Sequence, residues 1–517
     1  MIRTRFAPSP TGFLHIGGVR TALFNWLYAH QHAGHYVLRI DDTDQLRNIE
    51  AALNPILEGF RWLDLHWDEG PQREGQQSYF QSQRSHRYQA AVEQLLASGH
   101  AYKDYSRTEE LEAEREAARA AGTPFVYSRR YAGDTPERAA AFAAEGRPAV
   151  VRLKMPREGE LVIHDLVRGA VVFPWAQEAD HVIQRADLSF IYHLANVVDD
   201  EDFGISHVLR AEEHLPNTPR QIFMIHALGY RLPAYGHLPY VAEPGSKRKL
   251  SKRKLDAYLK NADFAASHHH GQKIAAALGL NYAPETFNPV CVDFYAQIGY
   301  LPHALVNYLL LLGWSLDGST EYFTRAQMLE HFSLERIHGA PASFDPAKLL
   351  AVQKHWFGQL TLAEKLDGCW PFLLQAGLVA ADADDAARER VARIIELLGD
   401  RLTVFGDIVL QAPMLMKPVL RERDELACAK HLSAPAARAL LAAYADWLSA
   451  AACEDASVLE AASKQWLSER GAGMKQLMLP LRLAVTGQGA GPRLFDCMAL
   501  LGTPIVVARI RKAIDAG

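Results

Sequence analysis

The beginning of the chain changes from a strand-like to a helix-like pattern of hydrophobic and polar residues. Residues 2–7 have a period of two, because Ile2, Thr4 and Phe6 alternate with Arg3, Arg5 and Ala7, and this predicts a strand. Val19, Ala22, Leu23, Trp26 and Leu27 then recur on one helix face, and Gly34 marks the end of that helix. Residues 36–40 predict a second strand that leads into the acidic cluster 41–44. Such a strand, turn, helix, strand unit binds ligands at the carboxyl ends of its strands.

The same patterns continue along the chain. Helices are predicted at 53–65, 84–98, 108–122 and 216–228, and strands at 150–155, 161–173, 181–185, 205–210 and 238–241. A second strand, helix, strand unit therefore follows the first, and two such halves form a cleft where the strand order reverses. From residue 346 to the end the periodicity is helical, as in 436–451 and 496–514.

Two stretches suggest chemistry. Gly17 and Gly18 precede the first helix, where exposed amides and the helix dipole favour a phosphate, and His15 could add a donor. Adjacent glycines also form ordinary tight turns. The second stretch, 246–254, is mostly lysine and arginine, which fits either a solvated basic loop or an anion-binding loop.

Composition is that of an ordinary water-soluble protein. Of the 517 residues 49% are hydrophobic and 22% are charged, with a net charge of -5. Met1 leads directly into a strand without a signal-peptide core, and the most apolar segment, 305–314, is too short to span a membrane, so we expect a cytoplasmic protein. The five cysteines are scattered and predict neither a disulfide framework nor a metal site.

The turn and the basic loop together carry a family resemblance. Residues 5–12 read RFAPSPTG, 15–18 read HIGG, 20–26 read RTALFNW and 249–253 read KLSKR. In these segments the chain resembles class I aminoacyl-tRNA synthetases, most closely the bacterial glutamyl type. The resemblance implies an α/β Rossmann-like catalytic domain with an inserted α+β acceptor-binding domain, followed by all-α stem-contact and anticodon-binding domains.

The implied domains follow in order. They are a first catalytic half at 1–105, an inserted acceptor-end-binding domain at 106–190, a second catalytic half at 191–255, a stem-contact helical domain at 256–345 with an insert near 256–298, and a helical anticodon-binding domain at 346–517. Helices rather than β-barrels at the C-terminus favour the glutamyl over the glutaminyl type.

The resemblance also implies a reaction and its residues. ATP, accompanied by magnesium, activates L-glutamate as glutamyl-adenylate, and the glutamyl group then passes to the 3′ end of tRNA(Glu). His15, Lys249, Ser251 and Lys252 are the implied catalytic residues. ATP would contact Pro8, Thr11, Gly12, His15, Gly17, Gly18, Lys249, Leu250 and Lys252. Glutamate would contact Arg5, Ala7, Ser9, Asp41, Tyr192, Asn196 and Arg210.

The chain departs from the family pattern at three places. Asp41 stands where the family usually has glutamate, and because aspartate is one methylene shorter, either a water bridges its contact to the substrate amino group or the substrate sits slightly deeper. The segment 102–106, where some relatives carry a zinc knuckle, has no cysteine, and we expect no structural zinc. The stretch 255–298 is longer than usual and contains His268, His269 and His270, which we interpret as a surface insertion in preference to a metal site because adjacent helix residues do not face one point.

Two alternatives stay open at this point. The enzyme could also charge tRNA(Gln) with glutamate, or the chain could be a silent relative that binds tRNA without activating an amino acid. Intact HIGG and KLSKR segments argue against silence. We further expect a monomer with no membrane partner, in which local basic surfaces hold tRNA against the acidic net charge.

Overall fold

The computed structural model describes residues 1–10, 13–42, 53–72, 78–123, 125–282, 287–420, 423–451 and 455–515. The chain divides into two compact units. The first, here called the N-terminal unit, comprises Met1–Phe264, Glu285–Asp293 and Pro302–Val352. The second, the C-terminal unit, comprises Ala265–Pro284, Phe294–Leu301 and Gln353–Gly517.

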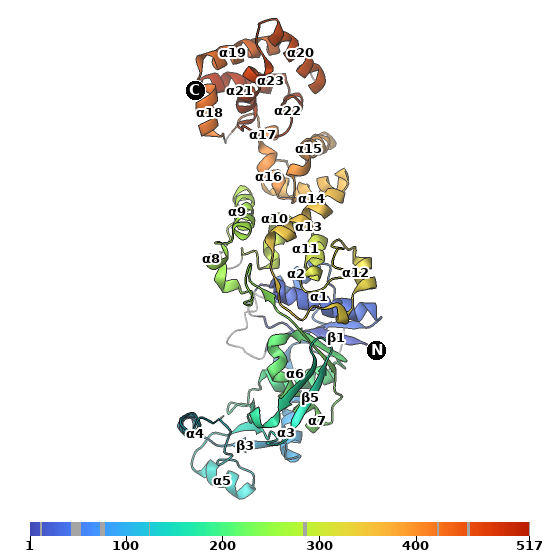
Figure 1. The fold of residues 1–517 in the computed structure, drawn as a ribbon, viewed down its shortest axis with the longest axis vertical. Coiled ribbons are helices and arrows are strands. Elements are labelled where there is room, and N and C mark those ends of the chain that lie inside the picture. The colour runs from blue at the N-terminus through green and yellow to red at the C-terminus, as the bar shows by residue number, and fades with distance from the viewer. Residues whose placement is uncertain are drawn as a thin grey trace. The chain divides into compact units, whose positions relative to one another are not determined.

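The first predicted strand, helix, strand unit is confirmed. Strands β1 (Arg3–Phe6) and β2 (His35–Leu38) pair in parallel, and helix α1 (Ile16–Gln31) connects them. Parallel neighbours need such a crossover. In Figure 1 α1 lies beside β1, where its apolar residues, among them Val19 and Leu23, are fully buried.

The second half repeats this arrangement. Strands β8 (His207–Ala211) and β9 (Ala234–Leu238) pair in parallel, and helix α7 (Thr218–Leu228) connects them. The backbone N–H of Ser206 donates to the carbonyl oxygen of Arg3 (3.0 Å), so β8 begins beside β1. The carboxyl ends of β1 and β8 are thereby brought to the same edge, where the predicted cleft should lie.

Helices and antiparallel strands follow β2 in the chain and precede β8. They are α2 (Leu53–Trp62), α3 (Ser85–Ala97), β3 (Ala101–Asp104), α4 (Thr108–Ala120), α5 (Pro136–Ala144), β4 (Val150–Leu153), β5 (Glu160–Asp165), β6 (Gly169–Pro174), β7 (Val182–Gln184) and α6 (Tyr192–Asp202). Strands β3, β4 and β7 form one antiparallel sheet, and β5 and β6 form a hairpin. Short 3₁₀ turns lie at Gln81–Gln83, Trp175–Gln177, Glu212–Asn217 and Gly399–Arg401.

The basic loop lies between two short structured segments. Strand β10 (Val241–Ala242) precedes it and pairs in parallel with β11 (Ala342–Ser343), while the 3₁₀ turn η5 (Lys252–Lys254) ends it and leads into α8 (Leu255–Tyr258). The predicted strand at 238–241 is wrong: β9 ends at Leu238 and β10 starts at Val241. Pro239 explains the break, because proline has no N–H to donate to a sheet.

Three further elements complete the N-terminal unit, namely α11 (Pro302–Leu311), α12 (Arg325–His331) and the 3₁₀ turn η6 (Leu334–Arg336). Helix α11 contains most of the apolar segment noted in the sequence and buries it inside the unit. In the described part of the chain, no helix has both the length and the apolar character needed to cross a membrane.

The C-terminal unit is helical, as predicted. Its helices are α14 (Leu362–Gln375), α15 (Asp385–Leu398), α16 (Asp407–Gln411), α17 (Pro413–Met416), α18 (Glu425–Leu432), α19 (Pro435–Ala450), α20 (Ala456–Ser468), α21 (Met474–Thr486), α22 (Leu494–Leu501) and α23 (Thr503–Asp515). Tyr444, Trp466 and Leu481 lie in its buried core. The helical stretch predicted at 496–514 is confirmed as two helices, because Gly502, with φ of 81°, separates α22 from α23.

Three helices cross the boundary between the units: α9 (Ala262–Ala277), α10 (Val292–Ile298) and α13 (Pro346–Gln359). The three adjacent histidines lie on α9, within the C-terminal unit. His270 bonds the Asp407 carboxylate (2.6 Å). Across the described ranges, no three His, Cys, Asp or Glu side chains are arranged to hold a metal ion.

Candidate active site

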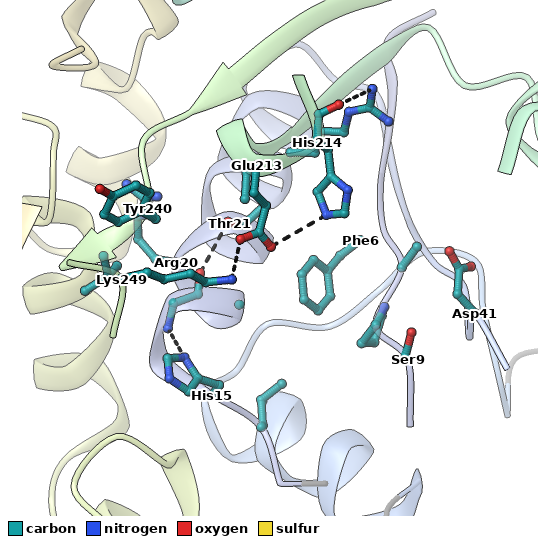
Figure 2. Close-up of a pocket in the computed structure, with 18 of the residues that line it drawn as sticks. Phe6, Ser9, His15, Arg20, Thr21, Asp41, Glu213, His214, Tyr240 and Lys249 are labelled. Carbon is teal, nitrogen blue, oxygen red and sulfur yellow. Dashed lines mark hydrogen bonds and ion pairs between the residues drawn. The ribbon is translucent and has the colours of Figure 1, made fainter. Parts of the chain in front are cut away.

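A cavity of about 780 Å³ opens at the carboxyl ends of β1 and β8 in the N-terminal unit (Figure 2). Its walls come from the segment after β1, the turn before α1, the 3₁₀ turn after β8 and the basic loop. Every described residue that the sequence analysis placed in the site lines this cavity: Arg5, Ala7, Pro8, Ser9, His15, Gly17, Gly18, Asp41, Tyr192, Asn196, Arg210, Lys249, Leu250, Ser251 and Lys252. Thr11 and Gly12 lie outside the described residues.

The turn before α1 presents a neutral histidine. His15 caps the helix, because its Nδ1 accepts a hydrogen bond from the backbone N–H of Gly17 (2.9 Å). Burial, helped by the nearby cations Lys252 and Lys249, lowers the pKa of His15 to about 3. With Nδ1 accepting, Nε2 carries the proton, and this buried atom has no hydrogen-bond partner in the described part of the chain. His15 can therefore donate to an anionic ligand.

Lysines of the basic loop meet this turn across the cavity. The Lys252 ammonium donates to the carbonyl oxygen of Phe13, and burial lowers the pKa of Lys252. Lys249 forms an ion pair with Glu213, which Figure 2 shows on one side of the cavity, while Ser9 and Asp41 lie on the other. The two segments, more than 200 residues apart in sequence, thus approach a common space with opposed N–H donors and ammonium groups.

A buried network of ion pairs supports the floor of the cavity. Arg5 pairs with Asp200 (3.1 Å), and Arg39 pairs with both Asp200 (2.7 Å) and Asp41 (2.7 Å). Burial raises the pKa of Asp41 to about 6, although the Arg39 charge opposes that shift. Buried charges persist when each has a partner, so Arg5 and Asp41 are held in fixed positions.

Arg210 is arranged differently from Arg5. Its Nε donates to His237 Nε2 (3.1 Å), and its Nη2 donates to the hydroxyl of Thr218 (3.0 Å) and the carbonyl oxygen of His214 (3.3 Å). Burial lowers the pKa of the Arg210 guanidinium. Its Nη1 is buried and has no partner among the described residues. A guanidinium with an unused N–H pair beside a cavity is suited to a carboxylate.

Sequence reasoning missed several cavity residues, namely Phe6, Arg20, Thr21, Glu213, His214, Tyr240 and Arg253. It also missed Arg39 and Asp200, which hold Arg5 and Asp41 in place. The signal for Asp200 was its position on α6, where Asp199 and Asp200 directly follow the apolar residues Val197 and Val198 and end the buried run of the helix. Which arginine it would meet could not be read from the sequence.

Comparison with known proteins gives matches over almost the whole chain. Residues 1–283 and 287–351 match the family described as tRNA synthetases class I (E and Q), catalytic domain, and residues 361–514 match the anticodon binding domain family. The glutamate–tRNA ligase of Moorella thermoacetica is 39% identical over 513 residues, which cover 99% of this chain and 98% of that protein. The glutamate–tRNA ligase of Bordetella avium is 38% identical over 511 residues, with the same coverage.

Solved structures agree with these sequence matches. The crystal structure of a glutamate tRNA ligase from Elizabethkingia meningosepticum, in complex with its amino acid, superposes with a TM-score of 0.83 at 30% identity and covers 99% of both chains. The glutamate-tRNA synthetase from Elizabethkingia anophelis gives a TM-score of 0.80, also at 30% identity. The chain therefore belongs to the glutamate–tRNA ligase family of class I aminoacyl-tRNA synthetases.

Proposed function

We propose that this glutamate–tRNA ligase forms glutamyl-adenylate in the 780 Å³ cavity and passes the glutamyl group to the 3′ end of tRNA(Glu). One observation carries the proposal: two groups of residues line the same cavity, the His15 turn with the Lys249–Lys252 loop that contacts it, and Arg5 with its neighbour Arg210. The first group suits a triphosphate and the second a carboxylate.

In the first step, the α-carboxylate of glutamate attacks the α-phosphorus of ATP and expels pyrophosphate. Such a transfer depends on positioning and on cations that face the developing negative charge. In our proposal, His15, Gly17 and Gly18 contact the phosphates from the helix N-terminus, and Lys249 and Lys252 neutralise the leaving pyrophosphate. Ser251 shapes the loop or bonds a phosphate. Magnesium enters with ATP as part of that substrate.

The remaining residues are assigned either to the ATP site or to the glutamate site. Pro8, Thr11, Gly12 and Leu250 complete the proposed nucleotide site. We assign the glutamate side chain to Arg5, Tyr192 and Arg210, its α-carboxylate to Asn196, and its amino group to Ser9 and Asp41, with Ala7 against the chain. The free Nη1 of Arg210 supports its role, whereas Arg5 already pairs with Asp200 and would share its charge with the substrate.

In the second step, a ribose hydroxyl of the tRNA terminus attacks the carbonyl carbon of the adenylate, and AMP leaves. The domains proposed for tRNA are the acceptor-end segment 106–190, the stem-contact segment 256–345 and the helical segment 346–517, with catalytic halves at 1–105 and 191–255. We also propose that the protein is a cytoplasmic monomer without structural zinc. Its family supports the monomer and the cytoplasmic location, and the absence of cysteine from 102–106 supports the absence of zinc.

Glutamate-dependent exchange of pyrophosphate into ATP, with and without tRNA, tests the proposal. Exchange should require glutamate, and Arg210→Ala should raise the KM for glutamate far more than the KM for ATP. Equal effects on both constants would contradict a side-chain contact. Charging of purified tRNA(Glu) and tRNA(Gln) then decides whether the enzyme accepts the second tRNA, and no exchange under any condition would favour a silent tRNA-binding relative.

A further inference from the structure

The turn of the β5–β6 hairpin is fixed to β9. The backbone N–H of Leu166 donates to the carbonyl oxygen of Tyr235 (2.8 Å), and Arg168 Nε donates to the carbonyl oxygen of His237 (3.3 Å). A Cβ on Gly236 would lie 3.6 Å from side-chain atoms of Leu166 and Val167, and 2.8 Å from Leu209. The hairpin, part of the predicted acceptor-end segment, is therefore seated directly on the second catalytic half.

Asp165, at the end of β5, is a buried acceptor at this contact. Its carboxylate accepts from the backbone N–H groups of Val167 (3.0 Å), Arg168 (2.9 Å) and His237 (3.1 Å), and it lies 2.5 Å from His237 Nδ1. Burial would raise the pKa of Asp165, but the hydrogen bonds from His237 outweigh it and leave that pKa below its ordinary value. An ionised Asp165 can only accept, so His237 Nδ1 carries a proton.

The protonation of Nδ1 determines what His237 offers on its other side. Both the Asp165 and the His237 side chain are fully buried, and burial lowers the pKa of His237. A neutral His237 with its proton on Nδ1 has a lone pair on Nε2, and Arg210 Nε donates to this lone pair (3.1 Å). Arg210 Nη2 donates to the hydroxyl of Thr218 (3.0 Å) and the carbonyl oxygen of His214 (3.3 Å), so these bonds and the one to His237 fix the guanidinium plane and leave Nη1 unused.

We propose that Asp165 and His237 are positioning residues for glutamate: Asp165 sets the tautomer of His237, and His237 orients Arg210 toward the substrate side-chain carboxylate. The acceptor-end hairpin thereby contributes to selection of the amino acid, although neither residue lines the cavity. The inference rests on the proposed contact between Arg210 and glutamate.

Two substitutions of His237 separate its two hydrogen bonds. In His237→Asn the amide NH₂ can replace Nδ1 and keep the bond to Asp165, but no group then accepts from Arg210 Nε, and only the bonds of Nη2 to Thr218 and His214 are left. In His237→Gln the amide oxygen can replace Nε2 and accept from Arg210. Asparagine should raise the KM for glutamate by about 10-fold or more, since bonds to charged groups are among the stronger ones, whereas glutamine should restore it toward that of the parent protein.

Asp165→Asn tests the tautomer directly. The amide oxygen of the new asparagine can still accept from the backbone N–H groups of the hairpin. Its NH₂, however, can donate to His237 Nδ1, and the imidazole proton then moves to Nε2. His237 Nε2–H and Arg210 Nε–H would then both be donors and could no longer form a hydrogen bond. We expect the same rise in the KM for glutamate as in His237→Asn, an unchanged KM for ATP, and no further rise in the double variant. A role in folding alone would lower the melting temperature without separating the two KM values.

Pyrophosphate exchange with tRNA present measures all variants of the full chain, with Arg210→Ala as the reference. If Arg210→Ala raises the KM for glutamate but Asp165→Asn and His237→Asn do not, the positioning role is wrong and the proposed site stands. If Arg210→Ala itself leaves that KM unchanged, the proposed glutamate contact is wrong. Should His237→Asn fail to fold, the nearly isosteric Asp165→Asn decides, and an unchanged KM there refutes the inference.

Discussion

Removal of the Lys252 ammonium is the most direct test of the proposed activation step. Lys252 lies at the end of the basic loop, and its ammonium reaches across to the carbonyl oxygen of Phe13 beside the His15 turn. In the proposed reaction, the leaving pyrophosphate would replace the neutral carbonyl oxygen of Phe13 as the acceptor for the Lys252 ammonium. The substitution Lys252→Ala keeps the loop backbone and removes the ammonium together with the alkyl chain that carries it.

The size of the effect follows from the partly buried position of the ammonium. A unit charge about 4 Å away at an effective dielectric constant of about 20 is worth about 4 kcal/mol, or roughly a thousandfold in rate. Loss of a single donor from an oxyanion site typically lowers kcat by about 10²–10³-fold. We therefore expect Lys252→Ala to lower kcat for pyrophosphate exchange by about 10²–10³-fold, with the affinity for tRNA nearly unchanged.

Lys247→Ala provides the matched control. Lys247 belongs to the same basic run and carries the same charge, but it is exposed and is not among the residues that line the cavity. Its removal should leave kcat within about threefold of the parent rate, as expected for an exposed charge. Exchange is measured with tRNA, glutamate and ATP at saturation. Equal rates for Lys252→Ala and Lys247→Ala would remove Lys252 from the mechanism.

Three further predictions concern stability and tRNA. Gly34→Ala should lower the free energy of unfolding, measured by chemical denaturation, by about 1–3 kcal/mol, because the new Cβ would lie 2.2 Å from the carbonyl oxygen of Ile2. Gly358→Ala is the control: the space around Gly358 is open, so this substitution should not lower the free energy of unfolding. The pKa of His15 is about 3 in the folded protein, so between pH 3 and pH 6.5 the unfolded chain binds more protons than the folded one. The free energy of unfolding should therefore fall as the pH drops from 6.5 toward 3. His15→Asn keeps the helix cap and should make that fall shallower by up to about 1.4 kcal/mol per pH unit. Raising the KCl concentration from about 50 to 200 mM should weaken tRNA binding in a filter assay by at least about tenfold, because contacts between lysine or arginine and the tRNA phosphates release bound counterions. An affinity that does not depend on salt would contradict tRNA binding through basic surfaces.

The parts of the fold that the sequence predicted correctly are those set by neighbouring residues. The alternation in residues 2–7, the helix face of Val19 and Leu23, and the helical period of 436–451 each depend on contacts within a few positions, so the periodicity alone locates β1, α1 and α19. The prediction of a strand at 238–241 failed where one residue interrupts a good pattern, because Pro239 separates β9 from β10. Gly502 likewise divides the helical stretch 496–514 into α22 and α23.

Local patterns in the chain were enough to locate many of its helices and strands, and two short motifs were enough to indicate phosphate chemistry. The pairings between distant charges were decided only in three dimensions. Arg5 meets Asp200, Lys249 meets Glu213, and Asp165 meets the His237 that holds Arg210. A buried charge or an oriented donor needs a partner, and which partner it finds depends on how strands β1, β5, β8 and β9 come together. No spacing along the chain encodes that choice, because the two members of such a pair can be tens to hundreds of residues apart.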